Sequence, residues 1–330
     1  MENLKLIANK MVVDGKGILA ADESTPTCTK RFEALQLKST DSTRNEYRST
    51  LFTSLELENY ISGIILFDET FYQNITGLNK PIPAYLKDKG ILTGIKVDKG
   101  AKPLANYHNE KITEGLDGLR ERLQIYKKQG ADFAKWRAVI TMGGENPSNA
   151  CIYSNAHALA RYASLCQESG IVPIVEPEVL MEGDHNIQKC YDTTSKTLDI
   201  IFSELKKLNV CLEAIILKPN MVLPGLQSSN QVNDELIARM TFDVLHKHVP
   251  KEVPGIAFLS GGQSSDLAAK RLNKLNQLYR EKAPWKLTFS YGRALQQDAL
   301  SQWASKSNEK TQDALIYRAH MNHLSSLGKL

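Results

Sequence analysis

The chain has few cysteines and no long apolar run, and each shortage excludes a class of protein. Its five cysteines are scattered and form no CxxC pair, so neither a disulfide framework nor a zinc-binding cysteine cluster is predicted. The first residues, MENLKLIANKMVVDG, lack the apolar stretch of a signal peptide. No segment approaches the roughly 18 apolar residues that span a membrane. We therefore expect reduced thiols and a soluble, cytoplasmic protein with no membrane partner.

The chain also lacks a large excess of charge of either sign, since its formal net charge is only +4. A net charge this small is far from the basic stripe expected of a nucleic-acid-binding protein, so no nucleic-acid partner is predicted. It is compatible with an anionic substrate. Histidines are too dispersed for a metal site. His246 and His248 face different sides of an expected helix, and no carboxylate or cysteine completes a set with His320 and His323. We expect no metal.

One short motif matches the dinucleotide-binding fingerprint GxGxxA, over residues 15–20. That fingerprint binds a dinucleotide only where it follows a strand and opens a helix. Here it leads into a strand, so no nicotinamide site and no cofactor are predicted.

Short apolar, β-rich runs recur along nearly the whole chain and alternate with segments of helical spacing. The runs are 17–21, 61–67, 91–97, 132–140, 171–179, 212–218, 255–261 and 286–292. Helical spacing is clearest over 116–126, 187–208 and 267–279. With no linker or shift in composition, residues 1–330 are expected to form one domain. The pattern predicts an α/β fold, a single (β/α)8 TIM barrel with extra helical segments at 2–12 and from about Gln296, although a doubly wound sheet fits the same count.

The carboxyl ends of these strands carry charged or glycine-rich residues. In chain order they are Asp22; Asp68 and Glu69; Lys96 and Asp98; Lys135 and Arg137; Glu176 and Glu178; Lys218; Ser260-Gly261-Gly262; and Ser290-Tyr291-Gly292-Arg293. Three of the pairs are spaced two apart, so both members lie on one face of a strand. Buried charge is costly unless it is paired, and the carboxyl ends of barrel strands meet at one mouth. The set therefore predicts an active site.

The composition of this set indicates the chemistry. Its cations outnumber the carboxylates that can neutralise them, and glycines follow the last two strands, as in barrel phosphate sites. Lys218 follows the apolar run Ala214–Leu217, so desolvation and the neighbouring Lys135 should lower its pKa and free the amine for attack on a carbonyl. Glu176 and Asp22 could move protons. The residues thus predict Schiff-base chemistry on a phosphorylated carbonyl compound.

Seven motifs resemble those of the class I fructose-bisphosphate aldolases. They are GKGILAADES (15–24), GIKVDKG (94–100), GADFAKWR (130–137), GIVPIVEPE (170–178), LKPNMV (217–222), LSGGQS (259–264) and LTFSYGRALQ (287–296). The match runs in register from about residue 15 to about residue 300. The resemblance implies a metal-independent (β/α)8 barrel, usually a homotetramer. It also implies a lyase of glycolysis and gluconeogenesis that cleaves fructose 1,6-bisphosphate reversibly into dihydroxyacetone phosphate and glyceraldehyde 3-phosphate.

Residue roles follow from the same resemblance. Lys218 would form the Schiff base at carbon 2, and Glu176, tuned by Glu178 and Lys135, would be the general acid/base. Asp22 would take the proton of the 4-hydroxyl as the carbon 3–carbon 4 bond breaks. The 1-phosphate would be held by Ser260, Gly261, Gly262, Ser290, Gly292 and Arg293, with Arg31 nearby. The 6-phosphate would be held by Ser24, Thr27 and Lys96, and Trp136 and Arg137 would line the pocket between.

Two departures from the family pattern qualify these expectations. Pro26 and Thr27 stand where the family more often has glycine and serine, so Pro26 should stiffen the turn and remove an N–H donor. Many relatives also carry a longer tail ending in a tyrosine that assists proton exchange. This sequence ends at Leu330, so we expect water, the substrate phosphate or another side chain to serve, or a slower step.

Two other functions remain open at the level of sequence. The same chemistry could prefer another phosphorylated ketose, such as fructose 1-phosphate or sedoheptulose bisphosphate. The barrel could also act as a non-catalytic scaffold for a partner protein, although Asp22, Glu176 and Lys218 are all present.

Overall fold

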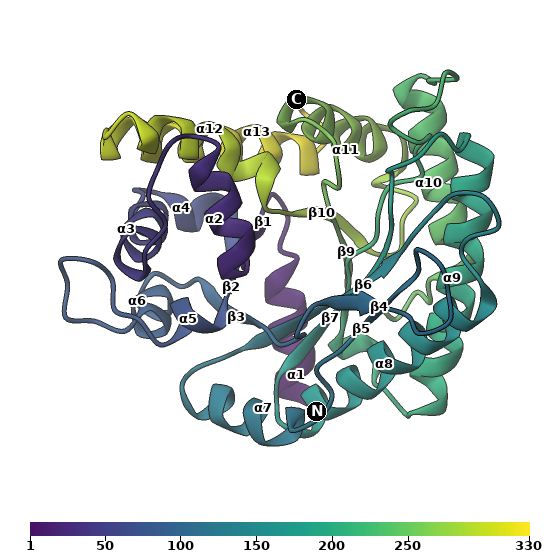
Figure 1. Ribbon diagram of the computed structural model, residues 1–330, viewed down its shortest axis with the longest axis horizontal. Coiled ribbons are helices and arrows are strands. Elements are labelled where there is room, and N and C mark those ends of the chain that lie inside the picture. Colours follow the sequence, from purple (N-terminus) through teal and green to yellow (C-terminus); the bar gives the residue numbers. More distant parts are fainter.

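Eight parallel strands form the centre of the molecule, and the computed structural model describes every residue from 1 to 330. They close into a barrel in the order β1-β10-β9-β8-β7-β6-β3-β2 (Figure 1). The strands are β1 (Gly17–Ala21), β2 (Ile61–Leu66), β3 (Leu92–Lys96), β6 (Phe133–Ile140), β7 (Val172–Val179), β8 (Ile216–Leu217), β9 (Gly255–Phe258) and β10 (Lys286–Tyr291). Closure is made where β10 pairs with β1, Ser290 opposite Ile18. The predicted barrel is confirmed, and the doubly wound alternative is wrong.

Helices alternate with the strands and surround the barrel (Figure 1). They are α2 (Thr25–Glu33), α3 (Asp41–Phe52), α4 (Leu57–Tyr60), α5 (Asp68–Phe71), α6 (Ile82–Asp88), α7 (Leu119–Lys128), α8 (Asn149–Glu168), α9 (Ile187–Lys207), α10 (Asp234–His248) and α11 (Ser265–Tyr279). Side chains at the N-caps of α8, α9, α10 and α11 each accept a bond from a backbone N–H of the first turn, which fixes where these helices begin. The extra terminal helices are also present, as α1 (Glu2–Met11), α12 (Arg293–Ala304) and α13 (Asn308–Ser326).

Apolar side chains fill the amino-terminal half of the barrel. A separate core cluster joins Leu4, Ile7 and Met11 of α1 to barrel residues that include Phe133 and Ile216. Glycines make room for the largest ring, since a Cβ on Gly63 or Gly94 would lie 2.8 or 2.2 Å from Phe133. With this end closed by α1 and the interior packed, only the carboxyl ends of the strands open to a ligand.

The structure differs from the predicted elements in two places. The strand expected over 212–218 is only Ile216–Leu217, because residues Leu212–Ala214 form a 3-10 turn (η1) held by the side chain of Gln167. A two-stranded hairpin, β4 (Ala101–Pro103) with β5 (Lys111–Thr113), was not predicted. Strands of three residues carry too little alternation to stand out in a sequence.

Candidate active site

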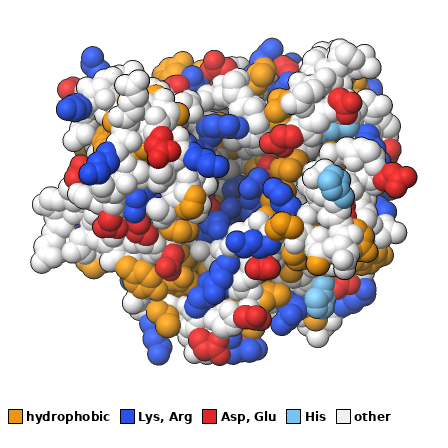
Figure 2. Space-filling model, viewed as in Figure 1, with side chains coloured by type: hydrophobic (Ala, Val, Ile, Leu, Met, Phe, Trp, Pro, Cys, Tyr) orange, Lys and Arg blue, Asp and Glu red, His pale blue; other side chains and the backbone are white.

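The carboxyl ends of the barrel strands surround a cavity of about 1010 Å³. Figure 2 shows the hollow in the middle of this face, with Lys and Arg side chains gathered in and around it. All but two of the site residues predicted from the sequence line the cavity, the exceptions being Gly262 and Trp136. The residues that line it are Asp22, Ser24, Thr27, Arg31, Lys96, Lys135, Arg137, Glu176, Glu178, Lys218, Ser260, Gly261, Ser290, Gly292 and Arg293. The chain therefore brings together side chains from seven of the barrel's strand ends.

Strand register sets the spacing at the centre of the cavity. On β6 and β7, Arg137 lies opposite Glu176, and the backbone N–H of Lys218 bonds to the carbonyl of Val175 at 2.8 Å. Lys218 thereby lies beside Glu176. The same alternation turns the side chain of Trp136 away from the barrel interior. It is fully buried outside the strands, with its ring 5.6 Å from that of Tyr162 of α8. Trp136 does not line the pocket, and that expectation was wrong because it has the opposite strand parity from its neighbour Arg137.

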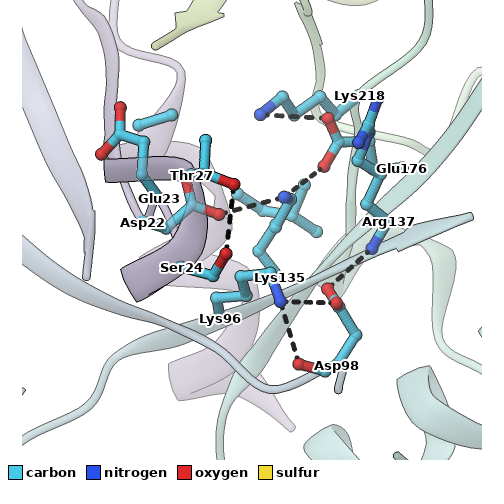
Figure 3. A network of polar contacts seen from close by, with 12 residues as sticks. Asp22, Glu23, Ser24, Thr27, Lys96, Asp98, Lys135, Arg137, Glu176 and Lys218 are labelled. Atoms are coloured by element: carbon cyan, nitrogen blue, oxygen red, sulfur yellow. Dashed lines mark hydrogen bonds and ion pairs between the residues drawn. The ribbon is translucent and has the colours of Figure 1, made fainter. Parts of the chain in front are cut away.

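Four side chains form a continuous series of ion pairs across the mouth (Figure 3). Lys218 Nζ lies 3.2 Å from Glu176 Oε1, and Lys135 Nζ lies 3.0 Å from both Glu176 Oε2 and Asp22 Oδ2. None of the four side chains is more than 11% exposed. The contact between Lys135 and Glu176 Oε2 lacks hydrogen-bond geometry, so this oxygen retains a lone pair for a ligand.

The pKa values of this series follow from burial and neighbouring charge. Burial lowers the pKa of the Lys218 amine, and the cation of Lys135 lowers it further, against the opposing effect of Glu176. Burial would raise the pKa of Glu176 and of Asp22, but the two lysines outweigh it. They hold the pKa of Glu176 below its usual value and bring that of Asp22 to about 2. The two carboxylates are therefore ionised, while the Lys218 amine is easier to deprotonate than an ordinary lysine.

A second group of charges lies beside the first. Lys96 Nζ is 2.6 Å from Asp98 Oδ1, and the other oxygen of Asp98 accepts the backbone N–H of Arg137 at 3.2 Å. The guanidinium of Arg137 pairs in turn with Glu178. Asp98 therefore offsets the charge of Lys96, and Glu178 offsets that of Arg137.

The loops after β9 and β10 form one side of the cavity. Arg293 Nη2 donates to the carbonyl of Gly261 at 2.9 Å, which joins the two loops. The hydroxyl of Ser290 is buried and has no hydrogen-bond partner. Gly261 has φ +56°, a left-handed conformation that favours glycine. Gly262 is the other exception among the predicted residues, because its N–H is directed at the sulfur of Met181, 3.0 Å away, rather than at the cavity.

Helix α2, which follows β1, supplies the neighbouring side next to the loop after β10. Ser24 occupies the N-cap position of this helix without a side-chain capping bond, and its hydroxyl lies 3.1 Å from that of Thr27. Pro26 falls in the first turn, where a backbone N–H has no partner within the helix, so the missing donor costs the helix no bond. Arg31 reaches back to Glu23 at 2.5 Å, and Glu23 also accepts from Gln296 at 2.8 Å.

Several cavity residues were not predicted. Glu23 anchors Arg31, and its position directly after Asp22 could have drawn attention to it. Tyr126, whose hydroxyl donates to Asp68 at 2.5 Å, comes from α7, and Lys99 and Lys102 come from the loop after β3 and from β4. Tyr126 ends the segment of helical spacing over 116–126, but that spacing does not show which end of the barrel the residue reaches. No sequence period marks Lys99 and Lys102, because tertiary packing places the hairpin.

Metal ligands are not gathered anywhere in residues 1–330, since no group of three or more His, Cys, Asp or Glu residues is arranged to hold an ion. His320 and His323 do share a face of α13, but there they stack at 6.1 Å and pack against Tyr60. None of the helices has the length and apolarity needed to cross a bilayer.

Comparisons with known proteins agree with this geometry. Residues 3–330 match the family model described as fructose-bisphosphate aldolase class-I. The chain is 50% identical to a probable fructose-bisphosphate aldolase class 1 of Xanthomonas campestris, over all of this chain and 98% of the relative. It is 49% identical to fructose-bisphosphate aldolase 4, cytosolic, of Arabidopsis thaliana, over 98% of this chain and 83% of the relative.

A solved structure is also similar. The fructose-bisphosphate aldolase of Plasmodium falciparum, determined in complex with TRAP and a small-molecule inhibitor, superposes with a TM-score of 0.97. The two chains are 44% identical, over 99% of this chain and 95% of the other. Fold and matches together define a lyase built on a closed (β/α)8 barrel. The chain belongs to the class I fructose-bisphosphate aldolase family, and the family predicted from its motifs is confirmed.

Proposed function

We propose that the chain cleaves fructose 1,6-bisphosphate reversibly into dihydroxyacetone phosphate and glyceraldehyde 3-phosphate, through an imine on Lys218. The observation that carries the assignment is the buried Lys218 amine, 3.2 Å from a carboxylate and lowered in pKa. An amine needs to be neutral to attack a ketone, and a nearby base must accept its proton. Membership of the aldolase family supports the same reaction.

Proton transfers along the ion-pair series follow from its geometry. Glu176, ionised in the free protein, accepts the proton of the Lys218 ammonium, and the amine then adds to carbon 2. The resulting carbinolamine loses its hydroxyl as water when Glu176 returns the proton, which leaves a protonated imine. Lys135, within 3.0 Å of both carboxylates, keeps each of them ionised between these transfers.

Carbon–carbon cleavage uses the other carboxylate. Asp22 accepts the proton of the 4-hydroxyl, the bond between carbons 3 and 4 breaks, and its electron pair moves into the imine to form an enamine. Glyceraldehyde 3-phosphate leaves. Protonation of the enamine carbon and hydrolysis of the imine then release dihydroxyacetone phosphate and restore Lys218.

Two phosphates fit the charge distribution of the cavity. The buried, unpartnered hydroxyl of Ser290, with Ser260, Gly261, Gly292 and Arg293, supports a 1-phosphate site on the side of β9 and β10. On the other side, Lys96 with Ser24 and Thr27 would hold the 6-phosphate. Lys99 and Lys102 line the same cavity as Lys96, and these further cations favour bisphosphates over fructose 1-phosphate. Relative turnover of fructose 1,6-bisphosphate, sedoheptulose bisphosphate and fructose 1-phosphate tests this preference.

Borohydride trapping tests the mechanism directly. Incubation with dihydroxyacetone phosphate and reduction should fix one adduct, which peptide mass mapping should place on Lys218. Lys218→Met should give none, whereas Lys196→Met, a change at a lysine of α9 outside the cavity, should leave the adduct unaltered. An adduct on another lysine, or none in the unmodified protein, would overturn the proposal.

Three further features belong to the proposal. The absence of a linker between the strands supports one domain over 1–330, which predicts a single unfolding transition. A homotetramer is proposed from the family, and sedimentation analysis would test it. A cytoplasmic location is proposed from the scattered free thiols and from the cytosolic relative in Arabidopsis thaliana, and fractionation would test it.

A further inference from the structure

The loop after β9 contacts the thioether of Met181. The backbone N–H of Gly262 donates to Met181 Sδ at 3.0 Å. Met181 follows β7 and does not line the cavity, and the half-buried N–H has no other acceptor among the bonds of this loop. The sulfur is therefore the acceptor that holds this amide in place.

Packing between the glycine pair and Met181 is close. A Cβ added to Gly261 would lie 3.2 Å from the Met181 sulfur, and one added to Gly262 would lie 3.3 Å from it and 3.1 Å from Leu226. All three distances are shorter than ordinary van der Waals contact. The backbone of the loop thus packs closely against Met181, and a Cβ at either glycine would have to displace the Met181 or Leu226 side chain.

Met181 is itself anchored to a third loop. Its carbonyl accepts the N–H of Leu226 at 2.8 Å, in the segment after β8. On the other side, Arg293, the first residue of α12, donates to the Gly261 carbonyl at 2.9 Å. The loop after β9 is thereby fixed from both flanks, by a guanidinium that faces the cavity and by a thioether that does not.

We propose that Met181 is a positioning residue for the substrate's phosphate, acting through the loop Ser260–Gln263; this rests on the 1-phosphate site of the proposed function. A thioether is a weak, uncharged acceptor, so it orients the amide without placing negative charge near an anion. Without the thioether, the Gly262 N–H lacks an acceptor, and the loop spends less time in the conformation that binds phosphate. Apparent affinity then falls in proportion to the fraction that remains competent.

The test compares Met181→Leu with Met240→Leu. Leucine keeps the size and apolar character of methionine but removes the sulfur. Met240 is a half-buried methionine of α10 outside the cavity, so it undergoes the same chemical change as a matched control. Each protein is assayed for KM and kcat with fructose 1,6-bisphosphate. Each is then trapped by borohydride with dihydroxyacetone phosphate and, separately, with unphosphorylated dihydroxyacetone.

For Met181→Leu we expect KM to rise about fivefold, the net effect of one lost hydrogen bond, with kcat nearly unchanged. Half-saturation of trapping with dihydroxyacetone phosphate should rise by a similar factor, while trapping with dihydroxyacetone should match the unmodified protein. An unchanged KM, or an equal loss with both ketones, would overturn the role of Met181. Failure of the unmodified protein to trap either ketone would instead refute the imine on Lys218.

Discussion

Replacing Lys135 with methionine removes the cation that joins the two buried carboxylates. The Lys135 amine lies 3.0 Å from Asp22 and 3.0 Å from Glu176, and its side chain is 6% exposed. Methionine fills much of the same volume without charge, so the effect of Lys135→Met is chiefly electrostatic. Asp22 would then lose its direct ion-pair partner, and Glu176 would keep only Lys218 as one.

The magnitude can be worked from Asp22. Its pKa is about 2 in the folded protein, against a usual value of 3.8, because the cations of Lys135 and Lys218 overcome the cost of burial. That difference is worth about 2 kcal/mol of stability at neutral pH. Glu176 loses a partner as well, and breaking a buried pair by removing one member costs about 3–5 kcal/mol. We therefore expect the free energy of unfolding to fall by about 3–5 kcal/mol.

The pH dependence has a definite sign. A carboxylate whose folded pKa is lowered adds stability above its unfolded pKa, and this stability is lost as pH falls through the folded pKa. The part due to Asp22 is thus present above about pH 4 and disappears towards pH 2. The difference in stability between the two proteins should shrink over that interval.

Urea unfolding followed by tryptophan fluorescence, at pH 7 and at steps from pH 4 downward, measures both quantities. Arg120→Met is a suitable control, because Arg120 forms an exposed ion pair with Glu168 and exposed pairs contribute about 0–1 kcal/mol. If Lys135→Met lost less than about 1 kcal/mol at pH 7, the reasoning that Lys135 stabilises buried carboxylates would be refuted.

Three other changes test separate parts of the site. Ser290→Ala removes the buried, unpartnered hydroxyl and should raise KM for dihydroxyacetone phosphate about tenfold by loss of a bond to a charged ligand; steady-state kinetics of the condensation would show it, and an unaltered KM would place the phosphate elsewhere. Glu176→Gln should lower kcat about 10²- to 10⁴-fold. Because the Glu176 charge raises the pKa of Lys218, the same variant should shift amine labelling of Lys218 to lower pH, and a shift to higher pH would contradict the assigned electrostatics. EDTA should leave activity unchanged, since no cluster of metal ligands is present, and loss of activity restored by a divalent cation would refute metal-independent chemistry.

The sequence revealed the fold because barrel strands buried on both faces appear as continuous apolar runs. Residues 17–21 illustrate this, since all five are buried and all five belong to β1. The run over 212–218 misled by the same rule. It is buried from Ala214 onward, but Leu212–Ala214 form a 3-10 turn, and the carbonyls of Cys211 and Ala214 at its ends accept from the side chain of Gln167, so only Ile216–Leu217 pair as a strand.

The charged centre of the site could be predicted because strand parity fixes direction. Lys135 and Arg137, two apart on β6, both line the cavity, whereas Trp136 between them does not. Residues on loops and helices escaped the same reasoning. The N–H of Gly262 turns to a sulfur 81 positions away in the sequence, and no local pattern reports such a partner.

The short strand β8 has a consequence for how this protein could change. The backbone N–H of Lys218 is held by the Val175 carbonyl, one residue before Glu176, so the reacting amine and its carboxylate share one rigid frame of adjacent strands. Most of the groups proposed to face the phosphates lie outside that frame, on the loops after β9 and β10 and on the first turns of α2 and α12, although Lys96 and Ser290 belong to β3 and β10. Exchange of those loops, in evolution or by design, can therefore alter which ketose is accepted while leaving imine formation intact.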